Sequence, residues 1–530
     1  MNNFFRKALN KLNSYRKTLA ESDFINHNYR YFGKVSKLNN NKKKVVLFEF
    51  NRFHHLSHIA YSYLANVLAV KYDAKICAYT TMPSHSFLNS CEWQLSSFLP
   101  NVDFAVYRSF GVSKFLRPQV NRTQLEKAKK LLENIFPKLQ TKSDIESITL
   151  DGIWIGDLIY DSYMRFFLKT TIEIKDELFK DFLLTTLCVY VFWNDYFNEH
   201  DVMAVNASHC VYVNAIPLRI AINKDIPAFV SGAIHVYRLS KKNLFDSCDF
   251  LEYRKIFQSL PVDIRKKGLE TAKERIEHRF SGKIGIDMHY SIKSSFGADK
   301  AGSILIKSNR TKVLIATHCF FDSPHSYGNN LFPDFYEWFD FLGKMTLETD
   351  YDWYVKTHPD YLPGTIDVIN SFIEKYPKFR LLPADSSHHQ IIAEGIDAAL
   401  TCYGTIGFEY AALGIPVINA SLNNPHIAYS FNLHPKNINE YEEIIRSIDK
   451  IDLNINKNEV YEYYFMKNIY TTNNWLFDDY NKMLNDIGGY DNQYTSDVYN
   501  VWLKEWGLLK HDSIIKKLNT FVDSGEFRLR

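Results

Sequence analysis

Residues suited to binding a nucleotide gather in one stretch, 398–419, which reads AALTCYGTIGFEYAALGIPVIN. Its pattern predicts a buried strand, a turn, a helix over 406–413 and a second strand. Gly404 and Thr405 lie in the turn, where free N–H groups at the start of a helix favour a phosphate. Thr405 is also expected to cap that helix. Glu409, near the first turn, would accept both hydroxyls of a ribose. The alternative is an ordinary turn with a solvated glutamate.

A histidine before a proline marks a second stretch, 351–360, which reads YDWYVKTHPD. The pattern predicts a strand that runs straight into the histidine. Because Pro359 disfavours helical backbone at the residue before it, His358 is presented at the end of this strand. The carboxyl ends of neighbouring parallel strands form the nucleotide cleft of α/β sheets. We therefore predict that His358 lies in the same nucleotide cleft as the glycine turn, where Lys356 could stabilise the negative charge of the leaving phosphate.

Acidic residues that could take part in catalysis lie in the N-terminal half. Asp157, Asp161 and Arg165 fall at i, i+4 and i+8, on one face of a predicted helix. Such charges often pair on a surface, but the aromatic and aliphatic neighbours here indicate burial. A carboxylate in an apolar cleft can have a raised pKa and act as a base. We predict Asp157 and Asp161 as catalytic, with His209, which follows another predicted strand, as a third candidate.

Histidines and acids follow two further predicted strands, in the segments NRFHHLSH (51–58) and HCFFDSPHSYG (318–328). The spacing could suit a metal, but neither segment contains HExxH and no second carboxylate cluster accompanies them. We therefore expect no metal and no other cofactor. We expect instead hydrogen bonds to a phosphate or a sugar. The predicted substrate-facing residues are Glu49, Asn51, His55, Asp322 and His325, and His318 is assigned to the donor nucleotide.

Composition narrows the class of protein. A chain of 530 residues suggests two or three domains, and a net charge of +3 gives no electrostatic case for nucleic acid as a partner. The 7 cysteines form no CxxC motif, which argues against structural zinc and a disulfide framework. The first 22 residues lack the apolar core of a signal peptide, and no apolar run is long enough to span a bilayer. We expect a cytoplasmic protein.

The elements that position these residues form two successive runs of alternating strands and helices, which is typical of parallel sheets covered by helices on both faces. The first run has expected strands over 44–50, 75–79, 103–108, 202–206 and 227–231. The second has expected strands over 312–317, 351–357, 379–382, 396–401 and from 417 onward. Two such domains facing each other would bring the strand-end residues into one inter-domain cleft.

The predicted division of the chain has four parts: a basic N-terminal arm (1–40), an N-terminal Rossmann-like acceptor domain (41–300), a C-terminal Rossmann-like nucleotide-sugar domain (301–470), and aromatic-rich C-terminal helices (471–530) that pack across both domains. One interpretation of the arm is a weak contact with anionic lipid on the inner face of the cytoplasmic membrane. The other is a solvated helix packed on the body of the protein.

An ordered set of motifs resembles one group of enzymes. The segments IGDLIYD, SH at 208–209, ATHCFFD, KTHPD and YGTIGFEYAALGIP are similar to those of bacterial capsule and surface-polysaccharide glycosyltransferases, especially the Kdo-transferase-like enzymes. The resemblance spans roughly residues 45–440 and is strongest over 311–420. It implies a GT-B fold, with two Rossmann-like domains facing a cleft. It also implies CMP contacts from His358 and Pro359, a phosphate at Gly404 and Thr405, and ribose at Glu409.

The resemblance implies transfer of a sugar, Kdo or a related ulosonic acid, from a CMP-sugar to an oligosaccharide or lipid-linked glycan in capsule or lipopolysaccharide O-chain synthesis. It implies that the transfer needs no metal. The acidic motif of polysialyltransferases has no match. Four alternatives stay open. They are a UDP- or GDP-sugar-dependent GT-B transferase, a CDP-glycerol-type transferase, a non-hydrolysing UDP-sugar epimerase, and a non-catalytic scaffold subunit of capsule assembly.

Overall fold

The computed structural model describes most of the chain: residues 17–39, 43–52, 54–80, 101–246, 248–288, 291, 293–297, 299–300, 302–358, 361 and 363–530. The predictions for Pro359 and for the first 16 residues of the basic arm therefore lie outside the described residues. The chain forms two compact units. Unit 1 comprises Met1–Ile159, Ile174–Asp246 and Asn473–Arg530, and unit 2 comprises Tyr160–Glu173 and Ser247–Thr472.

Unit 1 is built on a six-stranded sheet with the order β3-β2-β1-β6-β7-β8. All neighbours pair in parallel except β8, which runs antiparallel to β7. The strand order reverses between β1 and β6, which is the topological switch point of a Rossmann-like sheet. The strands are β1 (Val45–Glu49), β2 (Lys75–Tyr79), β3 (Val112–Leu116), β6 (Val202–Ala207), β7 (Ala228–Gly232) and β8 (His235–Leu239), and a separate hairpin consists of β4 (Thr149–Leu150) and β5 (Ile153–Trp154).

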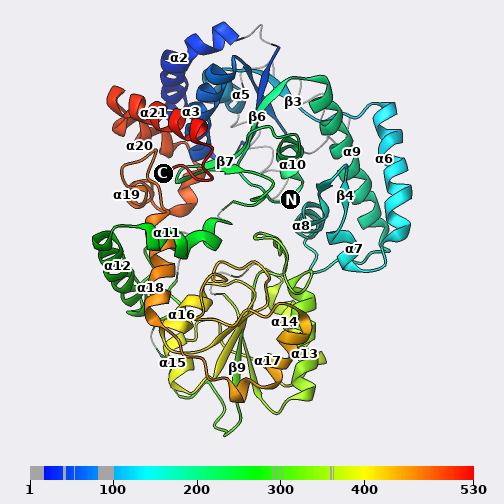
Figure 1. Cartoon of the computed structure of the whole chain (residues 1–530), viewed down its shortest axis with the longest axis vertical. Coiled ribbons are helices and arrows are strands. Elements are labelled where there is room, and N and C mark those ends of the chain that lie inside the picture. Colours follow the sequence, from blue (N-terminus) through cyan, green and yellow to red (C-terminus); the bar gives the residue numbers. More distant parts are fainter. Residues whose placement is uncertain are drawn as a thin grey trace. The chain divides into compact units, whose positions relative to one another are not determined.

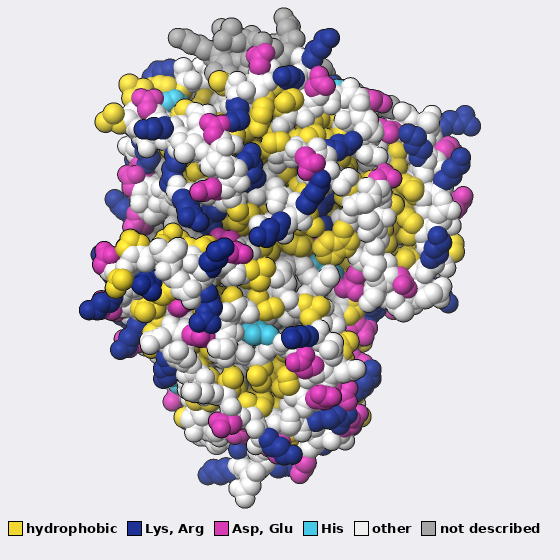
Figure 2. Space-filling view, in the orientation of Figure 1, with side chains coloured by type: hydrophobic (Ala, Val, Ile, Leu, Met, Phe, Trp, Pro, Cys, Tyr) yellow, Lys and Arg dark blue, Asp and Glu magenta, His cyan; other side chains and the backbone are white. Residues whose placement is uncertain are grey.

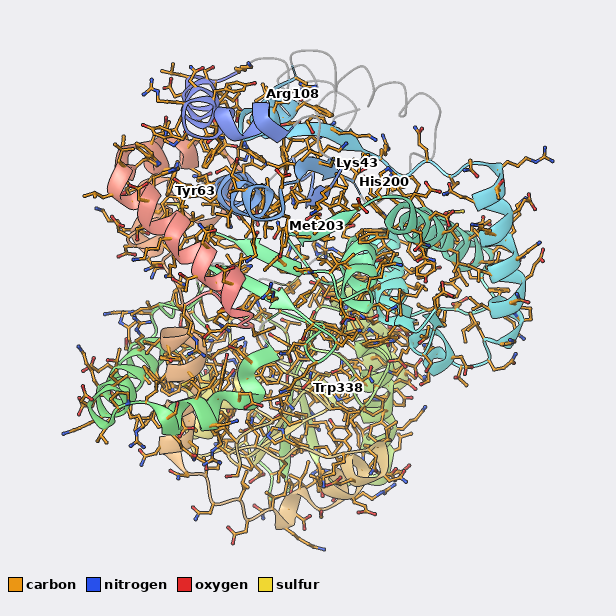
Figure 3. The ribbon with its side chains drawn as sticks, turned by 45° about the horizontal axis from the view of Figure 1, so that its top comes forward. Lys43, Tyr63, Arg108, His200, Met203 and Trp338 are labelled. Carbon is orange, nitrogen blue, oxygen red and sulfur yellow. The ribbon has the colours of Figure 1, made fainter. Side chains whose placement is uncertain are left out.

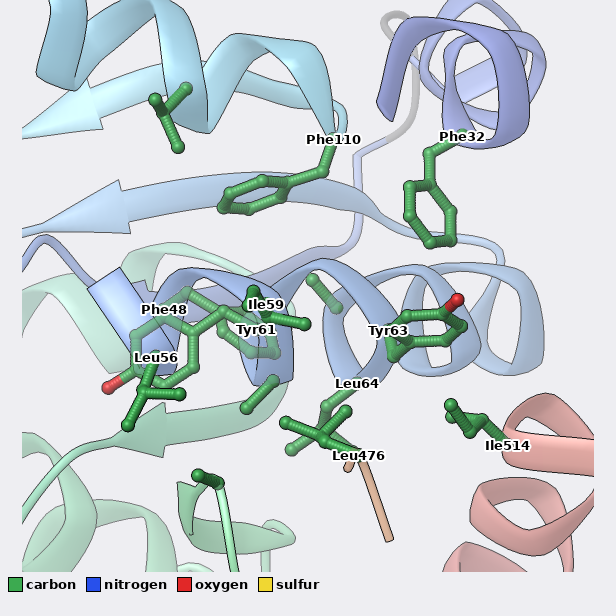
Figure 4. Packing of buried hydrophobic residues seen from close by; sticks show 14 of the residues in the cluster. Phe32, Phe48, Leu56, Ile59, Tyr61, Tyr63, Leu64, Phe110, Leu476 and Ile514 are labelled. Atoms are coloured by element: carbon green, nitrogen blue, oxygen red, sulfur yellow. The ribbon is translucent and has the colours of Figure 1, made fainter. Parts of the chain in front are cut away.

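The main core of unit 1 surrounds helix α3 (His55–Tyr72), which is buried along most of its length. Segments from both ends of the chain cover it, as Figure 1 shows for α2, α20 and α21. Figure 4 shows Phe32, Leu476 and Ile514 converging on Tyr63 and Leu64 of α3. The helices of unit 1 are α2 (Leu19–Asn39), α3, α5 (Val102–Ser109), α6 (Arg122–Ile135), η1 (Phe136–Lys138), α7 (Lys142–Glu146), α9 (Glu177–Glu199), η2 (Val213–Ala215), α10 (Ile216–Asn223), α19 (Tyr480–Asp486), η6 (Tyr490–Tyr494), α20 (Asp497–Glu505) and α21 (Leu508–Ser524).

Unit 2 is built on a five-stranded, fully parallel sheet with the order β11-β10-β9-β12-β13. Its order reverses between β9 and β12, so this sheet is also Rossmann-like. The strands are β9 (Lys312–Ala316), β10 (Asp352–Lys356), β11 (Phe379–Leu381), β12 (Ala398–Thr401) and β13 (Val417–Asn419). The helices are η3 (Cys248–Glu252), α11 (Tyr253–Ser259), α12 (Val262–Phe280), α13 (Phe335–Glu348), α14 (Thr365–Lys375), α15 (His388–Ala393), α16 (Ile406–Ala412), α17 (Ile438–Arg446), η4 (Ile448–Lys450), α18 (Lys457–Phe465) and η5 (Met466–Tyr470).

Alternate residues of the unit 2 strands face two separate cores, as the two-residue period of a strand requires. Val313 and Leu400 lie in the core under α13, α14 and α17, whereas Leu314 and Ala399 lie in the core under α15 and α16. Figure 1 shows these two groups of helices on opposite faces of the sheet. Trp338, labelled in Figure 3, is buried in the first core and donates its Nε1–H to Tyr441 Oη at 2.9 Å.

The α/β class with two Rossmann-like domains is confirmed, while the expected strand over 103–108 is wrong. That segment is the helix α5, and the third strand of unit 1 is β3 instead. Asn101 caps α5 by accepting the N–H of Asp103, and Phe104 and Tyr107 are buried at helical spacing. The sequence pattern also did not predict strand β8.

The compact units divide the chain differently from the expected domains. The change from unit 1 to unit 2 lies at Asp246 and Ser247, not near residue 300, and residues 473–530 belong to unit 1. Helix α8 (Gly156–Phe167) begins in unit 1 and continues in unit 2. No helix among the described residues is long and apolar enough to cross a bilayer. Positive and negative side chains are interspersed over the face shown in Figure 2, in keeping with the small net charge.

Candidate functional site

A buried lysine ends strand β10 at the carboxyl edge of the unit 2 sheet. Lys356 is 2% exposed, and its Nζ donates to the carbonyl of Ala384 at 2.9 Å. Among the described residues no carboxylate lies within salt-bridge distance of Nζ. Burial lowers the pKa of Lys356 to about 8, against the attraction of Asp385 and Glu409. At neutral pH this lysine is therefore a buried cation without a paired anion, which is costly until an anion binds.

Two histidines lie near this lysine. His388, at the start of α15, is buried, and its Nδ1 is 2.8 Å from Tyr410 Oη. Burial, and then the charges of Lys356 and Arg279, hold the pKa of His388 well below its usual value. His358 follows β10 two residues after Lys356 and is exposed. The predicted position of His358 at a strand end is therefore what the structure shows.

The glycine turn after β12 is held by a buried imidazole. His318 Nε2 accepts the backbone N–H of Cys402 at 3.1 Å and lies 3.0 Å from Thr401 Oγ1. Burial lowers the pKa of His318 to about 3, so the ring is neutral and Nε2 is an acceptor. His318 thus shapes the turn rather than contributing a positive charge. Gly404 donates its N–H to Thr401 Oγ1 at 3.2 Å.

Thr405 begins α16 but does not cap it as expected, because its side chain accepts no N–H from the helix. Its Oγ1 lies 3.5 Å from Nη2 of Arg279 instead. The same guanidinium forms a buried ion pair with Glu409 and reaches Asp287 at 3.4 Å. Burial raises the pKa of Glu409, and Arg279 opposes that rise. The carboxylate expected to bind ribose is therefore neither solvated nor open in this structure.

A second buried pair follows strand β9. His325 Nδ1 lies 2.6 Å from Asp161 Oδ1, and the backbone N–H of His325 donates to Asp161 Oδ2 at 3.3 Å. The segment that carries Asp161 is tied to the same unit by Asp334, whose Oδ2 accepts from Tyr160 Oη at 2.5 Å and from Thr171 Oγ1 at 2.6 Å. Asp322 lies three residues before His325, and its Oδ1 accepts the N–H of Ser323 at 2.8 Å.

In unit 1 the predicted substrate-facing Glu49 is a buried anchor at the switch point between β1 and β6. Its Oε2 accepts the N–H and the Oγ–H of Ser208, at 2.7 and 2.6 Å, and Oε1 accepts from Asn214 at 3.2 Å. Asn51, just beyond β1, donates its N–H to Tyr107 Oη at 2.8 Å. These bonds fix the loops at the carboxyl ends of both strands.

The described histidines that follow β1 and β6 in unit 1 have separate surroundings. His209 is exposed after β6, and its ring centroid is 6.4 Å from that of His54. His55 is half-buried, with its centroid 5.5 Å from that of His58. His58 is buried between Tyr499 Oη and the carbonyl of Asn51, each at 2.6 Å. In the part of the chain that the structure describes, no group of three or more His, Cys, Asp or Glu could hold a metal ion.

Asp157, the other predicted catalytic acid, is neutralised within unit 1. Its Oδ2 accepts from Arg219 Nη2 at 2.6 Å, and both side chains are buried. The guanidinium also donates to the carbonyl of Trp154 at 3.1 Å and lies 5.1 Å from the ring centroid of Phe245. Asp157 and Asp161 are therefore on one helix but have different partners in different units.

Sequence reasoning missed Arg279 and His388. Arg279 lies at the end of a long charged helix, α12. Because most charged residues of such a helix are solvated, the sequence gave no sign that this arginine is buried. His388 lies next to a second histidine in SSHHQ. This pair of adjacent histidines at the start of a short helix is the sequence feature that could have identified His388 as a candidate site residue.

Comparison with known proteins gives matches in structure only. No protein-family model matches the chain. No curated protein matches it in sequence. Among solved structures, it is similar to the beta Kdo 2,4 transferase KpsC of Thermosulfurimonas dismutans, at 11% identity and a TM-score of 0.32, covering 50% of this chain and 79% of that chain.

Two further matches cover more of the chain. A glycosyltransferase from Rickettsia africae is 10% identical, with a TM-score of 0.25 and coverage of 88% of this chain and 100% of that one. The UDP-GlcNAc 2-epimerase of Neisseria meningitidis is 10% identical, with a TM-score of 0.21 and coverage of 79% and 97%. All three TM-scores are low, so the function proposed below rests on this chain's own residues.

Proposed function

We propose that the chain is a glycosyltransferase of GT-B type that binds a nucleotide-sugar donor at the carboxyl edge of the unit 2 sheet. The observation that carries this proposal is Lys356, a buried ammonium at the end of β10 with no paired anion among the described residues. The phosphate of a nucleotide is an anion of suitable size and charge. Gly404 lies in the turn after β12, next to the switch point where α/β sheets bind ligands.

The leaving group of the transfer is a nucleotide whose phosphate gains negative charge as the glycosidic bond breaks. Lys356 stabilises that charge best in a buried site, where an electrostatic interaction is stronger than in water. His358 is the second donor to this phosphate. His318 keeps the turn at Gly404 in place through the N–H of Cys402.

A general base must remove the proton of the acceptor hydroxyl. Asp161 is the carboxylate that we assign, because Asp157 is already paired with Arg219. His325 orients Asp161 and takes part of its charge. An attack by the acceptor inverts the anomeric configuration, whereas an attack by Asp161 on the anomeric carbon would retain it. His209 is the alternative base.

The finer assignment is a CMP-activated ulosonic acid such as Kdo, transferred without metal to a glycan or lipid-linked acceptor of capsule or lipopolysaccharide. The motifs KTHPD and YGTIGFEYAALGIP support it by their resemblance to Kdo-transferase-like enzymes. Unit 1, with Glu49, Asn51 and His55 near its own switch point, would bind the acceptor. The cytoplasmic side of the membrane is the proposed place of action.

The test is a thermal-shift screen against CMP, CDP, UMP, UDP and GDP, because a ligand of the native state raises Tm according to its Kd. Wild type is compared with Lys356→Met, His358→Ala and the control Lys450→Met, whose lysine is exposed in η4. We expect CMP to stabilise wild type and the control but not Lys356→Met. Stabilisation by UDP or GDP alone would mean that the donor is a UDP- or GDP-sugar and not a CMP-sugar. No shift with any nucleotide would favour the scaffold alternative.

Turnover separates the remaining alternatives. Purified protein is incubated with the CMP-, UDP- or CDP-activated compound, and nucleotide release and product are followed by NMR. Release of CMP with a new glycosidic bond supports the transferase. Isomerised UDP-sugar without release of UDP would identify an epimerase, and glycerol-phosphate transfer would identify a CDP-glycerol-type enzyme.

A further inference from the structure

Two buried polar side chains in the loop after β13 have no hydrogen-bond partner. His426 is 1% exposed and Asn432 is 4% exposed. Neither ring nitrogen of His426 has a partner among the described residues, and neither the amide oxygen nor the amide nitrogen of Asn432 has one. Buried polar groups are nearly always satisfied, so four unsatisfied atoms on two neighbouring side chains call for a missing partner.

Both side chains point at the same place on α16. A Cβ placed on Gly407 would lie 2.5 Å from His426 Cε1, 2.7 Å from His426 Nδ1 and 2.9 Å from Asn432 Nδ2. Gly407 is two residues after Thr405, in the first turn of the helix that follows the glycine turn. We call the site formed by Gly407, His426 and Asn432 the Gly407 recess. Only glycine allows the two polar side chains to come so close to the helix.

The loop holds this arrangement through its own backbone. The N–H of His426 donates to Asn424 Oδ1 at 3.0 Å, and the N–H of Tyr429 donates to the carbonyl of His426 at 2.9 Å. The ring of Tyr463 packs 4.7 Å from the His426 ring, between centroids. The backbone of His426 is thus hydrogen-bonded, while the two side chains aimed at Gly407 are not.

The chemistry of the recess selects its ligand. Burial lowers the pKa of His426 to about 3, helped by His434 and Lys467, so the ring is neutral with one donor and one acceptor. Asn432 adds an amide with donors and an acceptor. The complement is an uncharged group that donates and accepts at once, which describes a hydroxyl. The short distances at Gly407 show that both side chains pack directly against this turn of α16.

We propose that the Gly407 recess binds sugar hydroxyls, first of all those of the donor ribose. This rests on the proposed function, since it places the ribose beside the turn assigned to the phosphate. The expected ribose ligand, Glu409, is occupied by Arg279, so the hydroxyls need another partner. The same chemistry fits the hydroxyls of a transferred or acceptor sugar, which is the second source.

The test uses the whole chain and compares CMP, UMP and GMP with their 2′,3′-dideoxy forms by calorimetry. Wild type is compared with Asn432→Leu, which keeps the volume and removes the amide, and with the exposed control Asn458→Leu. We expect wild type and the control to prefer the ribonucleotide by about tenfold or more. Asn432→Leu should bind both forms equally. Without ligand it should also melt at a higher temperature than wild type, because it no longer buries an unsatisfied amide.

A second variant and a second set of ligands complete the test. Gly407→Ala drives a methyl group into His426 and should abolish the ribose preference as well. Methyl glycosides of Kdo and glucose test whether the recess binds the hydroxyls of a transferred or acceptor sugar instead of the ribose. A glycoside could raise the melting temperature of wild type but not that of Asn432→Leu. This result would support a sugar as the ligand of the recess, even if no nucleotide bound and the proposed function failed.

Three outcomes would overturn the recess proposal. Wild type could bind the ribonucleotide and its dideoxy form equally and gain no protection from a glycoside. This result would be consistent with the nucleotide site but would show that the recess binds no sugar hydroxyl. A ribose preference that survives in Asn432→Leu would place the hydroxyls elsewhere. A lower melting temperature of ligand-free Asn432→Leu, without change in any ligand preference, would show that the recess holds a structural water only.

Discussion

His325 Nδ1 lies 2.6 Å from Asp161 Oδ1, although 164 residues separate the two in sequence. Both side chains are buried, and the backbone N–H of His325 donates to the other carboxylate oxygen. A carboxylate held at two points by one residue has a fixed direction. This fixed direction is the reason why we propose Asp161 as the general base.

We expect Asp161→Asn to lower transferase turnover by about 10²- to 10⁴-fold, because the amide cannot accept a proton. His325→Gln, which keeps a hydrogen-bonding group beside Asp161, should lower it less. The rate of nucleotide release with saturating donor is the measurement. Nucleotide affinity should stay within twofold or so of wild type, since neither residue is assigned to the phosphate. Full turnover by Asp161→Asn would rule out Asp161 as the base.

Asp157 should prove to be a structural residue. Asp157→Asn leaves Arg219 buried without its anion and should lower the free energy of unfolding by about 3–5 kcal/mol. Asp157→Asn/Arg219→Met removes both charges and should recover part of that loss. Urea denaturation measures both. If the double variant is folded but lacks turnover, Asp157 is catalytic after all.

The ion pair of Arg279 and Glu409 offers a direct test of the ribose assignment. Arg279→Met leaves Glu409 buried beside Asp287, and we expect a loss of about 3–5 kcal/mol in the free energy of unfolding. Glu409→Gln should lower stability without changing the preference for a ribonucleotide over its dideoxy form. If Glu409→Gln loses that preference, Glu409 is the residue that binds the ribose.

Lys356 should make nucleotide binding depend on pH. Its folded-state pKa of about 8 lies below the usual value of 10.5, so the free protein loses this charge as pH rises through 8. We expect nucleotide affinity to fall by up to about tenfold per pH unit above 8. Calorimetry between pH 7 and 9.5 measures the effect. Lys356→Arg keeps its charge and should show a flatter profile. A wild-type affinity that does not change with pH contradicts the role of Lys356.

The same lysine has an effect of opposite sign on stability. Between pH 8 and 10.5 the unfolded chain holds the proton of Lys356 more tightly than the folded protein does. Stability relative to Lys356→Met should therefore increase across this window as pH rises. Melting temperatures of both proteins at pH 7.5 and 10 give the comparison. A difference that stays constant would mean that Lys356 is not desolvated in the folded protein.

The sequence was sufficient to place residues at strand ends but not to choose their partners. Apolar runs bounded by turns located β9, β10 and β12, and with them His318, Lys356 and Gly404. The pairing of Glu409 with Arg279 depends on how α12 packs in unit 2, and no local pattern carries that information. The expectation for the segment 103–108 was wrong because a short continuous run of apolar residues suits a buried strand as well as a buried helix.

The order in which the chain contributes to its two units has a consequence for its synthesis. The chain passes between the units at residues 159/160, 173/174, 246/247 and 472/473. Helix α3 is covered by Leu476, Trp502 and Leu518, which are made much later than the helix itself. A growing polypeptide must therefore keep the apolar surface of α3 uncovered until these later residues have been made. A holding chaperone should therefore matter more for the yield of this protein than for one whose domains follow each other in order.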